Sequence, residues 1–572
     1  MPDVSGLDRV FDYAIPSALV GAALPGCRVS VPLHGRTVKG WIVAVGSREE
    51  LALDHVVPEN LVEIASVSGR SVEAALLPLT AEVARRWRGP RRAVLASASA
   101  PRVRSRPATS RRSHRPSESG RKPSPFETFL EGGGGVAHVA PGASVLALAV
   151  EAAAHGPVLV ICPTHRMARL GAAWLRRAGL TTAEVPDEWE RAEAGVDVVV
   201  GARSAVWAPC PGMRAIIVVD EHDDALKEDR VPAWDAASVA VLRAESLSVA
   251  WILASPVPSA RAMHQAGGRV FIAPGGWPRV VVEDLNGLRA PGSLLGSRLL
   301  AELGRVDSTI ACVLTTTGGA RLLVCDACRS VQRCPGCSAA LSHDEGGTLR
   351  CPRCADAHGS VCTMCGRGKL RTLRGGHAHL GREVERSTGR AVTLVSGDSD
   401  PGETAGRVLV GTEALLHRVS GLDTVVLADA DRDLLAPRVE APREFLALAA
   451  RAARAVGAGG LLVVQTRVPE HPLLAALGAP DAAAGVLSWL EKDLETRRGL
   501  DLPPFSEVVS VTYPASESPP SLPRLPPEVA CIGIERGFVL RSSSSAAMDA
   551  ALEYMRALPG PLPRVVVDPR RY

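Results

Sequence analysis

Short, continuous apolar stretches recur through most of the chain and predict strands that are covered on both faces. Segments with apolar residues at helical spacing lie between them, as in RMARLGAAWLRRAG (166–179). Strands that alternate with helices predict two doubly wound α/β lobes in succession. The strand-like stretches of the first lobe are VLVIC (158–162), VDVVVG (196–201), AIIVVD (215–220) and VAWILAS (249–255), and those of the second, which begin near residue 308, are TIACVL, AVTLVS, RVLVG, TVVLAD and GLLVVQ.

The segments around the two lobes have different patterns. Residues 1–95 carry short apolar stretches such as CRVSVPL between Pro and Gly turns, which predicts a small, mainly β module. Residues 96–125 are rich in Arg, Ser and Pro and lack an apolar period, so we expect a disordered basic linker, either a plain tether or one that also contacts phosphates. The lobes are expected at 126–275 and 276–470. Two helical segments followed by strands predict a C-terminal α/β domain at 471–572.

Composition narrows the possible classes of function. Hydrophobic residues make up 46% of the chain, enough for several packed cores, whereas aromatic residues make up only 3% and offer few faces for base stacking. The net charge of +4 is mild, so any DNA affinity must come from local basic patches. The N-terminus lacks a signal-peptide pattern and no apolar run is long enough to span a bilayer. We therefore expect a cytoplasmic protein without a membrane partner.

Eight cysteines in the middle of the chain form four CxxC pairs. A CxxC turn places two thiolates beside one tetrahedral ion, and two such turns complete a structural zinc site. In a reducing compartment this pattern predicts two closed zinc sites rather than disulfides, with no position left for a substrate water. The spacing alone leaves a nested and a sequential grouping of the pairs open. The predicted ligands are Cys325, Cys328, Cys334, Cys337, Cys351, Cys354, Cys362 and Cys365.

The residues around these pairs are expected to have structural roles. Between residues 325 and 374, basic residues outnumber acidic ones by eight to four, which offsets the negative charge of eight thiolates around two divalent ions. The five cysteines that stand singly, mostly in apolar stretches, are expected in the core. Four nearby histidines are expected on the surface because cysteines already complete both sites. These residues are Cys27, Cys162, Cys210, Cys312 and Cys531, and His343, His358, His377 and His379.

Ordered stretches along nearly the whole chain resemble the PriA family of replication-restart helicases. LDRVFDYAIP with LPGCRVSVPLHGRTVKGWIV resembles the family's N-terminal domain, and VVVGARSAVWAPCPGMRAIIVVDEHDDALKED resembles the stretch that leads into its Walker B carboxylates. VLVGTEALLHRVSGLDTVVLADAD is similar to a second-lobe helicase motif. VVQTRVPEHPLL and LEKDLETRRGLDLPPFSEVV resemble the entry to its C-terminal domain. The resemblance implies two RecA-like helicase lobes with a zinc-binding insertion at 322–370.

The family also implies roles for particular residues. It implies the nested zinc grouping, with one ion on Cys325, Cys328, Cys362 and Cys365 and the second on Cys334, Cys337, Cys351 and Cys354. It places a pocket for the 3′ end of a nascent DNA strand among Phe11, Asp12, Tyr13 and the stretch 35–40. Tyr13 can stack on a base or belong to the core, and Trp41, within an apolar stretch, is expected in the core.

The chain departs from the family at the phosphate-binding loop. A loop of the type GxxxxGK[ST] needs glycines for close approach, consecutive N–H donors and a lysine that reaches the β- and γ-phosphates. Here Ala137 replaces the first glycine, Pro141 removes a donor and Ala143 stands in place of the lysine. Lysine is absent between Lys122 and Lys227, so no shifted alignment restores it. Gly142, Ala143 and Ser144 therefore predict a degenerate nucleotide site.

Two further motifs are altered. The carboxylate pair Asp220 and Glu221 persists, but His222 and Asp223 replace the residues that follow it in the family. In the arginine-finger motif Arg454 aligns with one arginine, whereas Gly457 stands in place of the second. These losses predict a chain without ATP hydrolysis. Only the basic linker occupies the interval of the family's winged-helix domain, which is therefore expected to be absent or vestigial.

Three hypotheses follow from the sequence. The first is a non-enzymatic protein that binds forked and single-stranded DNA at abandoned replication forks and, with primosome proteins and the helicase-loading system, promotes reloading of the replicative helicase. The second is an active ATP-dependent 3′–5′ DNA helicase, which the missing lysine opposes. The third is a zinc-bearing adaptor that binds proteins but not DNA, which fits the mild charge and the few aromatic residues.

Overall fold

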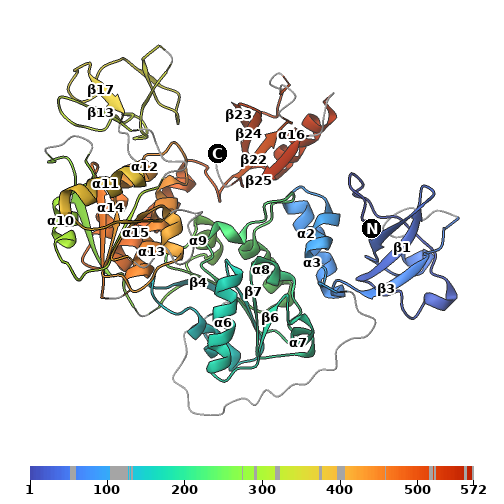
Figure 1. Cartoon of the computed structure of the whole chain (residues 1–572). Helices are drawn as coiled ribbons and strands as arrows, with labels where there is room; N and C mark the ends of the chain where they lie inside the picture. Colours follow the sequence, from blue (N-terminus) through green and yellow to red (C-terminus); the bar gives the residue numbers. More distant parts are fainter. Residues whose placement is uncertain are drawn as a thin grey trace.

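Five parts follow one another along the chain in the computed structural model (Figure 1). They are a small N-terminal sheet with two helices, two lobes built on parallel sheets, a cysteine-rich module inserted in the second lobe, and a C-terminal α/β unit. The structure describes residues 1–51, 60–102, 127, 129, 133–273, 275–288, 293–315, 322–344, 346–372, 376–395, 406–457, 459–514, 519–520, 524–558 and 563–569. Most of the predicted linker 96–125, and with it the interval of the winged-helix domain, lies outside these residues.

The first lobe is a parallel sheet of seven described strands in the order β10-β4-β9-β8-β5-β7-β6. Alternate residues of its strands face opposite layers: Val158 and Val160 pack under helices α5 and α6, whereas Leu159 and Ile161 face the layer that contains α8. Both faces are therefore buried, which is why these strands read as continuous apolar runs. The elements are β4 Gly134–His138, α5 Leu146–Ala153, β5 Val158–Ile161, α6 His165–Arg177, β6 Thr182–Val185, α7 Trp189–Ala194, β7 Val198–Gly201, β8 Ala215–Val219, α8 Ala236–Leu247, β9 Ala250–Ser255, α9 Ala260–Ala266 and β10 Val270–Ile272.

The second lobe repeats this plan with a parallel sheet whose described strands run in the order β11-β21-β20-β12-β19-β18. One face packs against α13, α14 and α15, and the other against α10 and α11. The two helices expected at the start of the C-terminal domain, α14 and α15, thus contribute to the core of this lobe. The elements are β11 Arg279–Asp284, α10 Ser297–Leu303, β12 Ile310–Val313, α11 His377–Thr388, β18 Thr393–Val395, β19 Val408–Gly411, β20 Thr424–Leu427, α12 Ala430–Leu434, α13 Ala441–Val456, β21 Leu461–Thr466, α14 Pro472–Leu477 and α15 Ala482–Gly499.

The N-terminal part combines an antiparallel sheet, in the order β2-β1-β3, with helices α2 and α3. The expectation of a mainly β module over residues 1–95 is wrong for its last quarter, because Leu79, Thr80 and Val83 recur at helical spacing and form a buried face of α2. Trp41 is buried, as expected, and its indole N–H donates to the Ser99 hydroxyl over 3.0 Å. The elements are β1 Cys27–Leu33, β2 Arg36–Trp41, α1 Arg48–Leu51, β3 Ser66–Arg70, α2 Leu77–Arg86 and α3 Arg91–Ala98.

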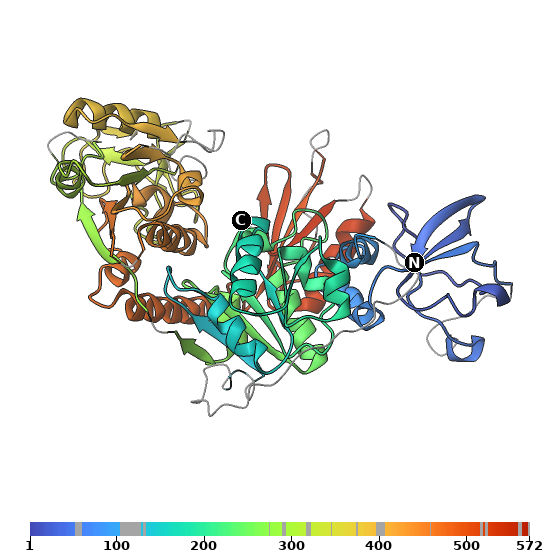
Figure 2. The ribbon, with the colours of Figure 1, turned by 60° about the horizontal axis from the view of Figure 1, so that its bottom comes forward.

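The C-terminal unit is an antiparallel sheet, in the order β23-β24-β22-β25, covered by α16. It packs on the first lobe beside α2 and α3, and Figure 2 shows these three parts together. Arg88, after α2, bridges the parts because it pairs with Glu507 and, at 2.9 Å, with Asp549. The elements are β22 Glu507–Thr512, β23 Ala530–Ile534, β24 Gly537–Ser542, α16 Ser545–Ala557 and β25 Arg564–Val567.

Among the described residues, none of the helices has both the length and the apolar composition needed to cross a membrane.

Candidate functional sites

The cysteine-rich module is closed at its base by two short antiparallel strands, β13 Leu323–Cys325 and β17 Leu370–Thr372. The chain between these two strands forms a second small sheet of β14 Ser342–His343, β15 Leu349–Arg350 and β16 Ala357–His358. The eight cysteines gather in two groups, within each of which the sulfur atoms lie within 4.8 Å of one another. This is the nested grouping that the family resemblance implied. The groups are Cys325, Cys328, Cys362 and Cys365, and Cys334, Cys337, Cys351 and Cys354.

The spacing of the sulfur atoms fits a tetrahedral ion. A zinc ion bound at about 2.3 Å has ligand sulfurs about 3.8 Å apart along the edges of its tetrahedron. The Cys325 and Cys365 sulfurs are 3.6 Å apart, and those of Cys337 and Cys354 are 3.8 Å apart. Backbone N–H groups within the CxxC turns also point at the thiols, as from Met364 to the Cys362 sulfur at 3.4 Å. The two sites therefore have the donor set and dimensions of closed structural zinc sites.

One polar side chain stabilises each group from outside the CxxC pairs. Gln332 is fully buried, and its Nε2 donates to the Cys362 sulfur over 3.3 Å while its Oε1 accepts from the Thr363 N–H. His358, expected on the surface, instead lies half-buried beside Cys334. Burial opposes ionisation of Cys334, but the N–H of Cys337 and the His358 side chain outweigh it and lower the pKa of Cys334 to about 6.

The module is fixed to the second lobe by an apolar contact and by arginines. Val324 and Val331 of the module pack with Leu435 and Val468 of the lobe. Arg353 donates to the Ala436 and Arg438 carbonyl oxygens, both at 3.0 Å, and other arginines reach the lobe at Leu288 and Glu470. Because loss of either metal group would release these contacts, the ions are expected to stabilise the junction as well as the module.

The loop that corresponds to a phosphate-binding loop follows β4. Its backbone donors are few, because Pro141 has none and the Ala143 N–H donates to the Ala140 carbonyl over 2.9 Å. Gly142 and Ser144 are exposed, and Ala143 adds only a methyl group. The loop thus lacks the lysine and two of the N–H donors that a phosphate-binding loop uses to hold a triphosphate.

The acidic motif follows β8 at the same edge of the sheet. Asp220 is buried and adopts a left-handed backbone conformation with φ of 47°, which Asp tolerates better than most residues. Glu221 points into the lobe and accepts from the Ser259 N–H over 2.6 Å and from its hydroxyl over 2.9 Å. Burial raises the pKa of Glu221 to about 7, against these hydrogen bonds. His222 contacts the Ser255 hydroxyl at 2.7 Å, and burial lowers its pKa to about 4. The side chains of Glu221 and His222 are therefore bonded to residues of the first lobe itself.

Arg454 of α13, in the second lobe, reaches across to both of these loops. Its two terminal nitrogens each donate to Asp220 over 2.7 Å, and its Nε donates to the Pro141 carbonyl over 2.8 Å. The sequence identified Arg454 as a remnant of the arginine-finger motif but gave no sign of its partner. Burial raises the pKa of Asp220, but its hydrogen bonds and charge interaction with Arg454 outweigh this and hold the pKa below its ordinary value.

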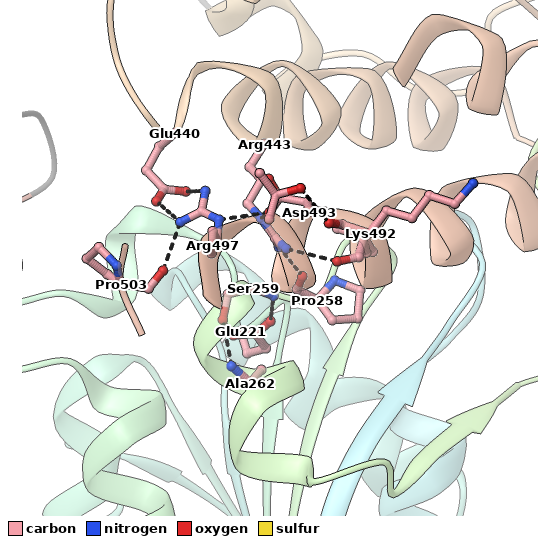
Figure 3. A network of polar contacts seen from close by, with 12 residues as sticks. Glu221, Pro258, Ser259, Ala262, Glu440, Arg443, Lys492, Asp493, Arg497 and Pro503 are labelled. Atoms are coloured by element: carbon pink, nitrogen blue, oxygen red, sulfur yellow. Dashed lines mark hydrogen bonds and ion pairs between the residues drawn. The ribbon is translucent and has the colours of Figure 1, made fainter. Parts of the chain in front are cut away.

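A second polar network joins the lobes to the start of the C-terminal unit (Figure 3). Arg443 donates to the Pro258 carbonyl of the first lobe over 2.8 Å and to Asp493 of α15 over 2.6 Å. Arg497, also on α15, pairs with Glu440 and with Asp493 and donates to the Pro503 carbonyl over 3.1 Å. The first lobe, the second lobe and the C-terminal unit are therefore connected through buried arginines.

The predicted 3′-end pocket corresponds to a cavity of about 290 Å³ in the N-terminal sheet. Phe11, Asp12 and Tyr13 line it, and of the stretch 35–40 only Gly40 does so. Tyr13 is anchored, since its hydroxyl donates to the Pro32 carbonyl over 3.0 Å. The lining is mostly apolar and suits the face of a flat, uncharged group better than a phosphate.

The metal sites can be tested by counting ions. Purified protein is expected to hold two zinc ions per chain, and the Cys328→Ser/Cys365→Ser variant one, because both substitutions fall in the same group. Elemental analysis and chelator-release assays measure this number. The Cys531→Ser variant, outside both groups, should keep two ions. Loss of both ions from the double variant would indicate sequential grouping and contradict the structure.

The protonation of Glu221 predicts a pH-dependent stability. Folding raises its pKa from 4.5 to about 7, so the folded chain binds this proton more tightly than the unfolded chain. The stabilisation is fully present below pH 4.5 and is lost as the pH rises toward 7. Glu221→Gln removes this dependence. The melting temperature of the variant minus that of the native protein should therefore increase from pH 5 to pH 8, by about 1 to several degrees. A difference that is constant with pH would show that Glu221 titrates normally.

Comparisons with known proteins place these sites in context. The model of the PriA 3′ DNA-binding domain (3′BD) matches residues 1–100. The replication restart protein PriA of Haemophilus influenzae is 27% identical over 362 residues, covering 56% of this chain and 47% of that protein. That of Thermotoga maritima is 26% identical over 412 residues, covering 62% and 53%. The chain therefore spans about half the length of these two relatives.

The probable replication restart protein PriA of Mycobacterium tuberculosis matches a larger share of the chain. It is 28% identical over 583 residues, which cover 90% of this chain and 86% of that protein. Among solved structures, a DEAD box protein from Methanococcus jannaschii is 12% identical and covers 63% of this chain and 86% of its own, with a TM-score of 0.31. The helicase Lhr of Mycobacterium smegmatis is 13% identical and covers 76% and 60%, with a TM-score of 0.34. At these values the structural likeness carries no statement about activity.

Two findings relate the protein to the PriA family of replication restart proteins. The model of the family's 3′ DNA-binding domain matches the N-terminal part, and PriA sequences match over as much as 90% of the chain.

Proposed function

We propose that the protein binds stalled or abandoned replication forks and promotes reloading of the replicative helicase without hydrolysing ATP. The N-terminal domain would bind the 3′ end of a nascent strand. The two lobes would serve as a rigid connection between this domain, the cysteine module and the C-terminal unit.

The observation that carries the proposal is the loop between β4 and α5. A triphosphate requires a cation and several N–H donors at this position, and the loop has no lysine and has lost two of the donors. Ala143 stands where the lysine belongs, Pro141 has no N–H, and the Ala143 N–H is already used by Ala140. The same observation argues against an active ATP-dependent helicase, because that activity needs the γ-phosphate to be held and released.

DNA binding is supported by the N-terminal domain. The matched 3′ DNA-binding domain model covers this part, and the cavity beside Phe11 and Tyr13 has the apolar lining that a terminal base requires. The guanidinium of Arg9 lies 4.9 Å from the centre of the Phe11 ring, so a positive charge adjoins the aromatic face. Such a pair can stack on a base while attracting its phosphate. The adaptor hypothesis, which lacks DNA binding, leaves this cavity without a use.

The cysteine module is the proposed contact for single-stranded DNA or for other restart proteins and the helicase-loading system. Its last CxxC turn exposes Val361 and Met364, and the exposed, positively charged Arg367 and Lys369 follow this turn in the chain. The zinc ions would supply structure only, because four sulfurs complete each group and leave no open coordination position.

The fork-binding proposal is tested by comparing three DNA molecules of equal length. A fork whose nascent strand ends in a 3′-hydroxyl should bind more tightly than the same fork with a 3′-phosphate, and both more tightly than a blunt duplex. Phe11→Ala should weaken binding to the first fork about 10-fold, within the range for loss of one base–aromatic contact. Fluorescence anisotropy at several salt concentrations measures these affinities, and the native protein should hydrolyse no ATP in the same mixtures.

The controls separate the pocket from general effects. Tyr554→Ala removes a half-exposed aromatic side chain of α16 that does not line the cavity, and should leave fork binding unchanged. Ala143→Lys should remain inactive as an ATPase because Pro141 still removes an N–H donor. Equal affinity for all three DNA molecules would support the adaptor hypothesis, and DNA-stimulated hydrolysis by the native protein would support the helicase.

A further inference from the structure

Three arginines on one helix of the second lobe point at the first lobe. Arg443, Arg451 and Arg454 lie on α13, and their spacing of eight and then three residues places them on one side of the helix. Their partners in the first lobe are the Pro258 carbonyl at 2.8 Å, Asp223 at 3.5 Å and Asp220 at 2.7 Å. The helix therefore presents a positive face to the first lobe.

The partners of these arginines share one place in the fold. Pro141, Asp220 with Asp223, and Pro258 follow β4, β8 and β9, which are neighbours in the parallel sheet. They therefore lie at the carboxyl ends of adjacent strands, the edge at which open α/β sheets bind their ligands. In this structure the edge is in contact with arginine side chains of the same chain.

Arg454 makes the most complete of these contacts. All three nitrogen atoms of its guanidinium are used, two on the Asp220 carboxylate and one on the Pro141 carbonyl. The Asp220 side chain is only 4% exposed, so its charge depends on this partner. Bidentate pairs of this kind are geometrically specific as well as strong.

We propose that the Arg454 guanidinium is the permanent internal ligand of this edge and holds the two lobes closed in the absence of nucleotide. In this arrangement a side chain of the second lobe bridges the remnant phosphate loop and the remnant metal-binding carboxylate. The closed arrangement of the lobes is thus stabilised by side chains of the protein itself and needs no bound molecule.

Neighbouring contacts support a closed state that is more than a single ion pair. Val257 of the first lobe packs within the apolar core of the second lobe. Arg166 of the first lobe donates to the His417 carbonyl of the second over 3.0 Å. Arg451, between the two lobes, also pairs with Glu413 of its own lobe, which fixes the direction of its side chain toward Asp223. The two lobes therefore meet through apolar and polar contacts in addition to the pair of Arg454 and Asp220, in which the Arg454 side chain stays 40% exposed.

The inference is independent of DNA binding and is tested on the full chain without DNA or nucleotide. Arg454→Ala and Arg454→Lys are compared with the native protein by small-angle X-ray scattering and by hydrogen exchange of segments 139–148 and 221–227. The matched control is Arg305→Ala, which removes an exposed arginine of the same lobe that pairs with Glu302 away from the first lobe.

Arg454→Ala should enlarge the radius of gyration and speed exchange in both segments by about tenfold, while the core of each lobe keeps its protection. Arg454→Lys keeps the charge but loses the bidentate geometry, so its radius of gyration and exchange rates should lie between those of the native protein and Arg454→Ala. Arg305→Ala should match the native protein. Adding Asp220→Asn to Arg454→Ala should cause little further change, since the two residues act on one another. Unchanged exchange and unchanged scattering in Arg454→Ala would overturn the inference, as would equal opening in Arg305→Ala.

Discussion

A carboxylate that is buried without a partner is costly, and Asp220 imposes this constraint on the rest of the structure. It follows β8 at the carboxyl ends of the central strands of the first sheet, where the fold places it whatever the chemistry of the site. The neighbouring loop offers no lysine, so the positive charge must come from elsewhere. Arg454 supplies it from the second lobe, and the requirement for a partner thereby adds a specific ion pair to the other contacts between the two lobes.

The same reasoning explains why arginine recurs at every junction of this chain. Arg88 links α2 to the C-terminal unit, Arg353 links the cysteine module to the second lobe, and Arg497 links α15 to the loop at Pro503. A guanidinium can satisfy several carbonyl and carboxylate oxygens at once because its donors diverge in one plane. The chain has only a handful of lysines, so this role falls to arginine almost everywhere. The result is an assembly of small domains held by polar contacts as well as by shared apolar cores.

Much of the fold could be predicted from the sequence, because buried parallel strands leave an unmistakable apolar run. The strands from Val158 to Ile161 and from Ala215 to Val219 lie within the predicted stretches. Strand β4 was not predicted, since two of its five residues are glycine and its pattern resembles a loop. The helices α2 and α3 were also missed, because a β pattern earlier in the N-terminal module was extended over them.

The candidate sites were predictable where spacing alone defines them. The four CxxC pairs identified all eight cysteines, and the structure gathers them in the nested groups that the family implied. The contacts of Gln332 and His358 with these groups, and of Arg454 with Asp220, could not be predicted. Each depends on side chains brought together by the fold, and 234 residues separate Arg454 from its partner. A single sequence carries no signal for such a pair.

Isothermal titration of the native protein with Mg²⁺–ATP tests the central claim most directly, since the claim is that protein groups fill the place of the nucleotide. The account predicts no saturable binding at millimolar ATP, with unchanged heats when a non-hydrolysable analogue replaces it. Saturable binding in the micromolar range would show that Arg454 yields its place to a triphosphate and would contradict the account.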